Sequence, residues 1–424
     1  MKIVAPDTTH YQALVDTLER MLQHRRGLPT TQADELYYKL LLDYYRRPLH
    51  AQQEGKKLVA HAAYIPPEVF HALDIVPLNL ESWCIVFSSV LKDFEGLASV
   101  AKGYGLPPEV CSAHRVQAAL FLKGWLPRPD AVVWSQQICD SISHSGHLLK
   151  EVYGLPGFYV DRPYGYDDKA VKYYAQEMGG MVAFLEDLAG RRMDWDRLLE
   201  ALAQSQEISR LQGQINSLTR AIPSPAPNRL GVQLQVINWL GLGTREGVAF
   251  CQNRREELQD RVERGKGYYP RERHRLISLF PPPAFRWKLL DWMGREHGAS
   301  IVAEPYAYHW GPWEVDPRQP LETLARRCFA VPTSRHYHGA INYSMVPDAV
   351  EDALSHHCQG AIYFAMINCR QGAAMVRTVK DALREKAGIP TLVVDIDVLD
   401  PTFVTDDELK DKIEGFLETL EEGR

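Results

Sequence analysis

One structural unit occurs twice in this sequence, and the repetition limits the folds that the chain can adopt. In the first copy, the apolar run Ala131–Ile138 is followed by Cys139, a helical segment, a Gly-Leu-Pro turn and a strand that ends in aspartate. In the second copy, Ala361–Asn368 is followed by Cys369, a helical segment, a Gly-Ile-Pro turn and a strand that also ends in aspartate. Strands that alternate with helices are typical of a parallel sheet. The repeat therefore predicts two similar α/β lobes.

The spacing of apolar residues extends this organisation to the whole chain. Residues 1–55 carry apolar side chains at three- and four-residue steps, which predicts two amphipathic helices. Short β-branched or aromatic runs alternate with helical segments over residues 56–165 and again over 299–424. Residues 166–298 are mostly helical, and proline-rich stretches interrupt them. We expect an N-terminal helical segment, a first α/β lobe, a helical connecting region and a second α/β lobe.

The composition excludes several classes of protein. A chain of 424 residues is long enough for two or three domains. Its 45% hydrophobic and 24% charged residues are typical of globular proteins, and a net charge of −6 without a long basic run argues against a nucleic-acid-binding protein. The N-terminus lacks the apolar core of a signal peptide, and no apolar run approaches the about 20 residues of a membrane span. We therefore expect a soluble, cytoplasmic protein.

Three of the seven cysteines are candidate ligands. Cys139 and Cys369 each follow the carboxyl end of a predicted strand, the edge at which open α/β sheets hold ligands. Cys111 falls in the first turns of a predicted helix, where backbone N–H groups favour a thiolate. Three such thiolates would suit an iron–sulfur cluster, whereas the usual role of a cysteine is that of a small core residue. The spacing alone leaves both interpretations open.

The remaining motifs are less specific. The segment EPYAYHWGPWEVDP contains Tyr308 and His309; its aromatic side chains could hold a flat acyl group, and the histidine could supply a proton near neutral pH. A loop anchored by aromatic packing is the alternative. The sequence contains no P-loop, no G-x-G-x-x-G dinucleotide motif and no G-x-S-x-G nucleophile elbow. The other cysteines are expected in the core: Cys84, Cys251, Cys328 and Cys358.

From about Lys57 onward, the chain resembles the 2-hydroxyacyl-CoA dehydratase and benzoyl-CoA reductase family. A shared order of several degenerate motifs is more specific than any one of them. The motifs that carry the resemblance are AYIPPEVFHALDIVPLNLES (Ala63–Ser82), CSAHR at Cys111, ICDS at Cys139, DPRQPLETLARR (Asp316–Arg327), AIYFAMINCRQG around Cys369, and the tail GIPTLVVDIDVLDP.

This resemblance implies two Rossmann-like lobes and a [4Fe–4S] cluster ligated by Cys111, Cys139 and Cys369. The fourth iron would keep a position open to water or substrate. Members of the family usually work as two related subunits, and a separate ATP-hydrolysing iron–sulfur activator supplies low-potential electrons. The implied substrate is an acyl-CoA whose thioester carbonyl accepts an electron to form a ketyl-type radical. Neither nucleic acid nor a membrane is an expected partner.

The resemblance leaves the reaction open. The aromatic segment near Tyr308 favours reduction of an aromatic acyl-CoA, as in benzoyl-CoA reductase, with His309 as the candidate catalytic residue. An (R)-2-hydroxyacyl-CoA dehydratase subunit is the first alternative. A non-catalytic subunit that carries electrons or completes the complex is the second. A relative that holds a larger, fused cluster is the third.

Overall fold

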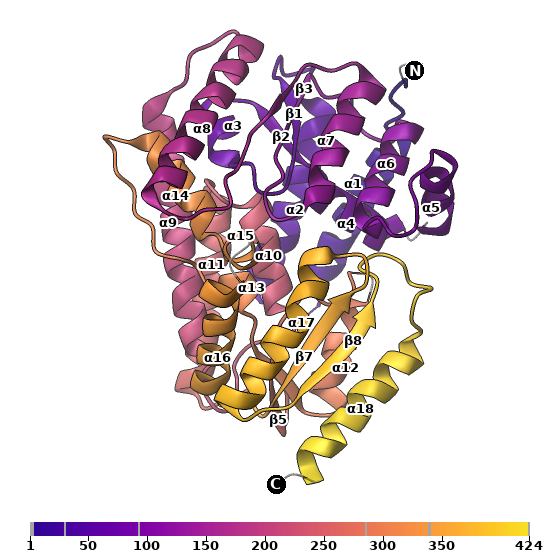
Figure 1. The fold of residues 1–424 in the computed structure, drawn as a ribbon, viewed down its shortest axis with the longest axis vertical. Helices are drawn as coiled ribbons and strands as arrows, with labels where there is room; N and C mark the ends of the chain where they lie inside the picture. The colour runs from indigo at the N-terminus through magenta and orange to yellow at the C-terminus, as the bar shows by residue number, and fades with distance from the viewer. Residues whose placement is uncertain (1–3, 29–30, 92–93, 285, 338–340, 423–424) are drawn as a thin grey trace. The chain divides into compact units, whose positions relative to one another are not determined.

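Two parallel sheets flanked by helices form the framework of this protein (Figure 1). The structure, a computed structural model, describes residues 4–28, 31–91, 94–284, 286–337 and 341–422. The predicted α/β class is confirmed. The chain divides into two compact units, each built from three separate stretches: residues 1–208, 236–251 and 311–334 in the first, and 209–235, 252–310 and 335–424 in the second. The domain boundaries given above stay predictions.

The first unit contains a four-stranded sheet in which all strands run parallel. The strands are β1 (Leu58–His61), β2 (Val76–Asn79), β3 (Ala131–Trp134) and β4 (Gly157–Tyr159), in the order β2-β1-β3-β4. All residues of β1, β2 and β3 are buried, as expected for a parallel sheet with both faces covered. Each of the four strands falls inside a run that the sequence predicts as a strand.

The second unit repeats this topology. Its strands are β5 (His274–Ser278), β6 (Ala299–Ala303), β7 (Gly360–Met366) and β8 (Thr391–Ile396), in the order β6-β5-β7-β8, again all parallel. In both sheets the strand order reverses between the first and third strands. Ligands of open α/β sheets bind at such a reversal, outside the carboxyl ends of the strands.

Strand β5 was not predicted, because it lies in the segment that the sequence describes as mostly helical. Its residues include His274 and Arg275, two polar side chains that are buried in the structure. The guanidinium of Arg275 is neutralised by Glu272 and by backbone oxygens of four further residues: Thr219, Arg220, Ala221 and His356. Central strands of parallel sheets are usually recognised by a continuous run of apolar residues. In β5 the buried arginine interrupts that run.

Helices pack on both sheets and connect them. The first unit contains α1 (Thr9–Arg26), α2 (Gln32–His50), α3 (Pro67–Ala72), α4 (Leu80–Leu91), α5 (Phe94–Gly103), α6 (Ser112–Lys123), α7 (Asp140–Tyr153), α8 (Asp168–Ala189) and α14 (Pro320–Ala330). The second contains α12 (Trp287–Glu296), α13 (Pro305–Tyr308), α16 (Val346–Ser355), α17 (Arg370–Ala382), α18 (Asp406–Glu422) and the π-helical turns Ile341–Met345 and Leu383–Ala387. The chain passes between units within α9 (Trp195–Leu218), α10 (Leu230–Leu240), α11 (Arg245–Glu263) and α15 (Pro332–Tyr337).

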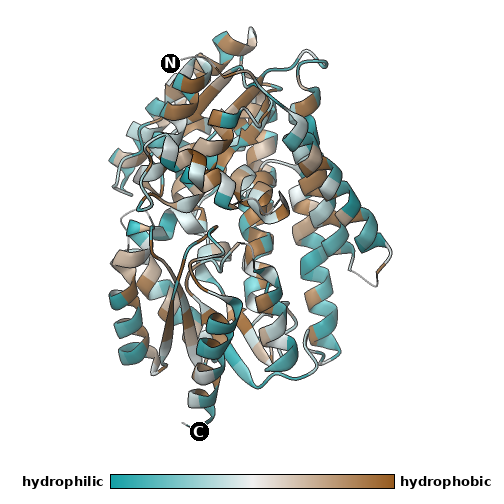
Figure 2. Ribbon diagram, turned by 90° about the vertical axis from the view of Figure 1, so that its right-hand side faces the viewer, coloured by the Kyte–Doolittle hydropathy of each residue, from teal (hydrophilic) through white to brown (hydrophobic). Residues whose placement is uncertain are grey.

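Hydropathy follows this layering. Figure 2 shows brown along the strands, and the helix at the C-terminus, α18, is largely teal. That helix buries one face, made of Leu409, Ile413, Leu417 and Leu420, and packs against β8. Among the described residues, no helix combines the length and the hydrophobicity needed to cross a bilayer.

A glycine fixes the approach of α7 to β3. A Cβ atom on Gly146 would lie 2.2 Å from Cγ of Trp134. We expect Gly146→Ala to lower the free energy of unfolding by about 1–3 kcal/mol, because the added methyl group overpacks this contact. Gly415→Ala is the matched control, since its Cβ would meet nothing within 4 Å; it should raise stability by about 0.5–1 kcal/mol. Denaturant unfolding measures both, and equal stabilities would show that α7 is free to move away from β3.

Candidate functional site

Each of the three predicted ligand cysteines begins a helix. Cys111 is the N-cap of α6, Cys139 the N-cap of α7 and Cys369 the N-cap of α17. The first turn of a helix presents backbone N–H groups and a partial positive charge, and both stabilise a thiolate. The sequence anticipated this setting for Cys111, and the structure extends it to Cys139 and Cys369.

Cys369 shows the effect of this position most directly. It follows β7, and the backbone N–H of Gly372 donates to its Sγ at 3.4 Å. The sulfur therefore occupies the place of a capping side-chain oxygen and is turned toward the start of α17. A hydrogen bond from an N–H group to sulfur favours the deprotonated form, which is the form that binds metal.

The backbone before Cys139 adopts an unusual conformation. Ile138 has a φ of +71°, in the left-handed region that β-branched residues rarely adopt. Such strain costs about 1–3 kcal/mol and is found where the surrounding structure fixes a functional position. The loop between β3 and α7 thus holds Ile138, the residue before Cys139, in a conformation that an isoleucine does not favour locally.

The other four cysteines have a contrasting environment. Cys84, Cys251, Cys328 and Cys358 are buried, as expected, whereas the three helix-capping cysteines are partly exposed. Burial raises the pKa of the Cys328 thiol to about 11 and raises that of Cys84 well above its usual value. The residues present therefore fit a cluster in one respect: the three partly exposed thiols are the three that the family resemblance implies.

The structure describes these three thiols in two separate units. Cys111 and Cys139 belong to the first unit and Cys369 to the second. Within the described parts of the chain, no three histidine, cysteine, aspartate or glutamate side chains already form a group suited to a metal ion. The convergence of the three sulfurs on one cluster stays a prediction.

A buried acid lies close to the start of α6, and sequence reasoning did not identify it. Glu81 lies just beyond β2, and its Oε1 is 3.9 Å from Nε2 of His114, which is in the first turn after Cys111. Burial raises the pKa of Glu81 to about 7 and lowers the pKa of His114 to about 4. A carboxyl group that titrates near neutral pH is suited to proton transfer. Its place just after a strand was the signal available in the sequence.

The predicted catalytic residue His309 lies in a buried charged network of the second unit. Its Nε2 is 3.5 Å from Oδ1 of Asp348, and its Nδ1 is 3.5 Å from Oδ2 of Asp352. Asp348 also forms an ion pair with Arg335 and lies 2.7 Å from Nε2 of His336. Burial alone would lower the pKa of His309, but the nearby carboxylates of Asp352 and Asp348 outweigh it and raise that pKa. His309 therefore retains its proton to a higher pH than an ordinary histidine, which suits it to act as an acid.

Two of the aromatic residues near His309 lie in the core and cannot line the binding wall that the sequence suggested. Tyr306 and Tyr308 are 1% and 2% exposed, respectively. The hydroxyl of Tyr306 donates to Glu304, and the hydroxyl of Tyr308 accepts from the backbone N–H of Glu304. Both rings are therefore core residues that fix α13, and the argument from them for a flat aromatic substrate does not hold.

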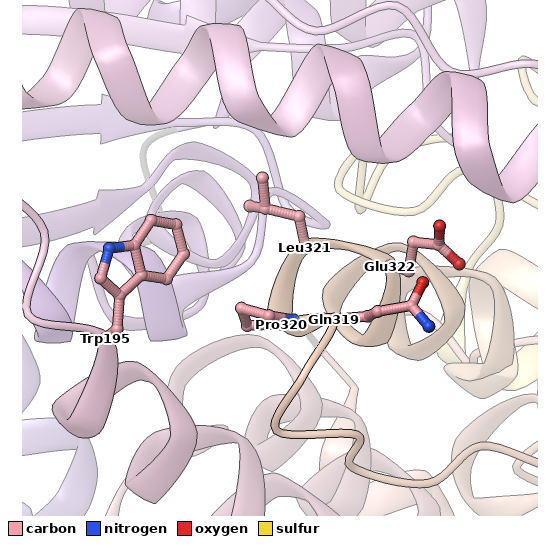
Figure 3. Close-up of a pocket in the computed structure, with 5 residues that line it drawn as sticks. All are labelled: Trp195, Gln319, Pro320, Leu321 and Glu322. Carbon is pink, nitrogen blue, oxygen red and sulfur yellow. The ribbon is translucent and has the colours of Figure 1, made fainter.

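A surface pocket of about 280 Å³ lies elsewhere in the first unit. Figure 3 shows Trp195, from the start of α9, on one side and Pro320 and Leu321, from the start of α14, on the other. Gln319 and Glu322 complete the lining. None of these residues belongs to the groups described above, and we assign the pocket no role.

Comparison with known proteins decides the family. The model of the family "2-hydroxyglutaryl-CoA dehydratase, D-component" matches residues 62–420. The chain belongs to this family. We therefore interpret the three helix-capping cysteines, Glu81 and His309 by comparison with members of this family.

Named relatives cover both reactions that the sequence left open. A benzoyl-CoA reductase subunit of Thauera aromatica is 23% identical, over 90% of this chain and 92% of its own length. The (R)-phenyllactyl-CoA dehydratase alpha subunit of Clostridium sporogenes is 22% identical, over 88% and 91%. The (R)-2-hydroxyisocaproyl-CoA dehydratase alpha subunit of Clostridioides difficile is 22% identical, over 90% and 95%. The predicted family resemblance is confirmed, and the relatives are subunits of enzyme complexes.

The difference between the two classes of cysteine predicts a pattern of chemical labelling. In reduced, iron-free protein, iodoacetamide should modify Cys111, Cys139 and Cys369 first, because these thiols are partly exposed at helix N-termini. The four buried cysteines should react only after unfolding. Peptide mass spectrometry at increasing reaction times measures this order. Early modification of Cys84 or Cys358 would contradict the assignment.

The network around His309 predicts a pH dependence. Because the pKa of His309 is raised above its ordinary value of 6.5, its stabilising effect is complete below that pH and is lost as the pH rises through the folded-state pKa. Asp352→Asn should lower the pKa of His309, as measured by NMR titration of its ring protons. Asp381→Asn, an exposed position on α17, should leave it unchanged. An unaltered titration in Asp352→Asn would show that Asp352 does not hold the proton on His309.

Proposed function

We propose that this chain is one subunit of an activator-dependent [4Fe–4S] enzyme that performs radical chemistry on an acyl-CoA. The observation that supports this best is the shared setting of Cys111, Cys139 and Cys369, each at the N-terminus of a helix and each partly exposed. Membership of a family whose named relatives are acyl-CoA reductase and dehydratase subunits supplies the substrate class.

In this proposal the three thiolates hold the cluster. When bound, a [4Fe–4S] cluster with three protein ligands transfers single electrons and leaves one iron accessible to a substrate oxygen. The helix N-termini lower the free energy of the charged thiolates, and the strained backbone of Ile138 directly precedes Cys139.

Two groups of the chain are suited to move protons. Asp348 and Asp352 favour the protonated form of His309, and its side chain is 21% exposed, so it can exchange a proton with a ligand or with solvent. Glu81 is buried and is half protonated near neutral pH, close to the start of the helix that Cys111 caps. We propose His309 as the catalytic acid. A related second subunit and a separate activator that hydrolyses ATP would complete the enzyme.

Two reactions are candidates for the activity of this enzyme. The aromatic segment at Tyr308 favours reduction of an aromatic acyl-CoA on sequence grounds, but that ring is in the core. The relatives of the two branches are about equally similar to this chain. We therefore retain aromatic acyl-CoA reduction and (R)-2-hydroxyacyl-CoA dehydration as the two candidates. Turnover of benzoyl-CoA and of a 2-hydroxyacyl-CoA by the complex with reduced activator distinguishes them.

Substitution of single cysteines tests the ligand set. Cys139→Ser should reduce iron and acid-labile sulfide from about four per chain to near zero, because serine replaces a thiolate that the cluster requires. Cys251→Ser, in the core, should retain both, provided that it folds. Anaerobic purification followed by iron and sulfide analysis gives the result, and circular dichroism checks the fold of each variant. A full complement of iron in Cys139→Ser, Cys111→Ser and Cys369→Ser would refute the proposal.

A further inference from the structure

One fully buried cation of the first unit has no hydrogen-bond or ion-pair partner among the described residues. Arg162 lies just beyond β4 and is 0% exposed. None of its three guanidinium nitrogens, Nε, Nη1 and Nη2, forms a hydrogen bond to any described group. A guanidinium taken out of water without a counter-charge is strongly unfavourable, so a fold that retains one normally provides an anion for it.

The other deeply buried arginines have the carboxylate partner that Arg162 lacks in the described part of the chain. Arg327 is paired with Glu68, and Arg254 with Glu257 and Gln233. Arg162 differs although an acid precedes it in the sequence. The carboxylate of Asp161 is engaged elsewhere, by the hydroxyl of Tyr173 at 2.7 Å and by Nε2 of Gln136 at 3.5 Å.

Aromatic rings surround the guanidinium of Arg162. Its Cζ lies 4.5 Å from the ring centroid of Phe329 and 5.4 Å from that of Tyr166. The ring of Tyr174 packs against Phe329, with centroids 5.5 Å apart. Cation–π contacts are favourable, but they are weaker than the penalty for burying an unpaired ion. They hold the side chain in place and leave all five N–H groups unused.

We propose that Arg162 is the binding site for the carboxylate of a small organic acid. A carboxylate carries one negative charge and matches the planar fork of a guanidinium with two parallel hydrogen bonds. It would neutralise the single unpaired charge, whereas a dianionic phosphate would leave one negative charge in a buried aromatic site. The rings of Phe329, Tyr166 and Tyr174 would contact the apolar body of such an acid.

The segment that carries Arg162 offers a route of entry. Tyr164 and Tyr166 are 60% and 37% exposed, and Gly165 lies between them. Tyr166 thus reaches from the guanidinium to solvent, and its hydroxyl donates to the carbonyl of Ser334 at a long 3.4 Å. The ring also packs against Phe329, with centroids 5.5 Å apart, and its rotation would expose the guanidinium.

The site lies at the carboxyl edge of the first sheet, the edge that also carries Cys139. Strands β3 and β4 are neighbours, and Gln137, in the loop that leads to Cys139, accepts a hydrogen bond from Tyr174 at 3.0 Å. A bound acid would therefore contact Tyr174, which forms a hydrogen bond with this loop. The inference goes beyond the proposed function and does not depend on it, because it concerns a free acid and needs no cluster.

Thermal unfolding of the purified protein with added anions tests the site. Acetate and benzoate, at constant ionic strength against chloride, should raise the unfolding midpoint of the wild type in a saturable way. Phosphate should have a smaller effect. Arg162→Met should abolish the response to carboxylates, whereas Arg377→Met, an exposed position on α17, should retain it. Equilibrium dialysis with labelled benzoate should give one site per chain in the wild type and none in Arg162→Met.

The stability of the variants without added acid provides a second measurement. Arg162→Met should unfold at the same or a higher temperature than the wild type, because it removes an unpaired buried charge. Arg162→Lys should fold and bind carboxylates more weakly, since lysine lacks the planar fork. A large drop in the midpoint of Arg162→Met, together with a wild type that does not respond to carboxylates, would show that the aromatic rings satisfy the guanidinium and would overturn the inference. So would a stronger response to phosphate, or an equal response in Arg162→Met.

Discussion

The parallel pairing of the strands determines where chemistry can occur in this chain. Because all strands of a sheet end at one edge, the residues that follow them and the helices that begin there are brought together. In both sheets the third strand is followed by a cysteine that caps a helix, Cys139 after β3 and Cys369 after β7. In the first sheet the same edge carries Glu81 after β2 and Arg162 after β4. The positions of these groups thus follow from the common direction of the strands.

Burial then separates structural from reactive groups of the same chemical type. Four thiols are inside the core, where burial keeps Cys84 and Cys328 protonated, and three are partly exposed at helix N-termini. Among the buried arginines, Arg275 and Arg327 are neutralised by carboxylates, whereas Arg162 has no hydrogen-bond or ion-pair partner among the described residues. Groups that a fold buries without satisfying them are characteristic of binding and catalytic sites.

Much of this fold was predictable from the sequence, because local pattern and tertiary position agree there. The runs of apolar residues identified β1–β4, and the strand–cysteine–helix repeat identified the positions of Cys139 and Cys369. Strand β5 was missed because Arg275 interrupts its apolar pattern, and the guanidinium is buried there by hydrogen bonds to backbone oxygens far away in the sequence, those of Thr219 and His356. The buried proton of Glu81 and the unpaired charge of Arg162 also arise only from tertiary packing. Tyr308 was misinterpreted for the same reason: an aromatic side chain at a strand end can belong to the core.

The proposed function requires Cys111, Cys139 and Cys369 to bind one iron–sulfur cluster. Anomalous diffraction at the iron absorption edge, from crystals of the complex grown without oxygen, tests it most directly. The account predicts a single strong iron peak for this chain, in contact with the sulfur atoms of all three residues and with no fourth cysteine. An iron peak bound to other side chains, or one that only two of these cysteines contact, would contradict it.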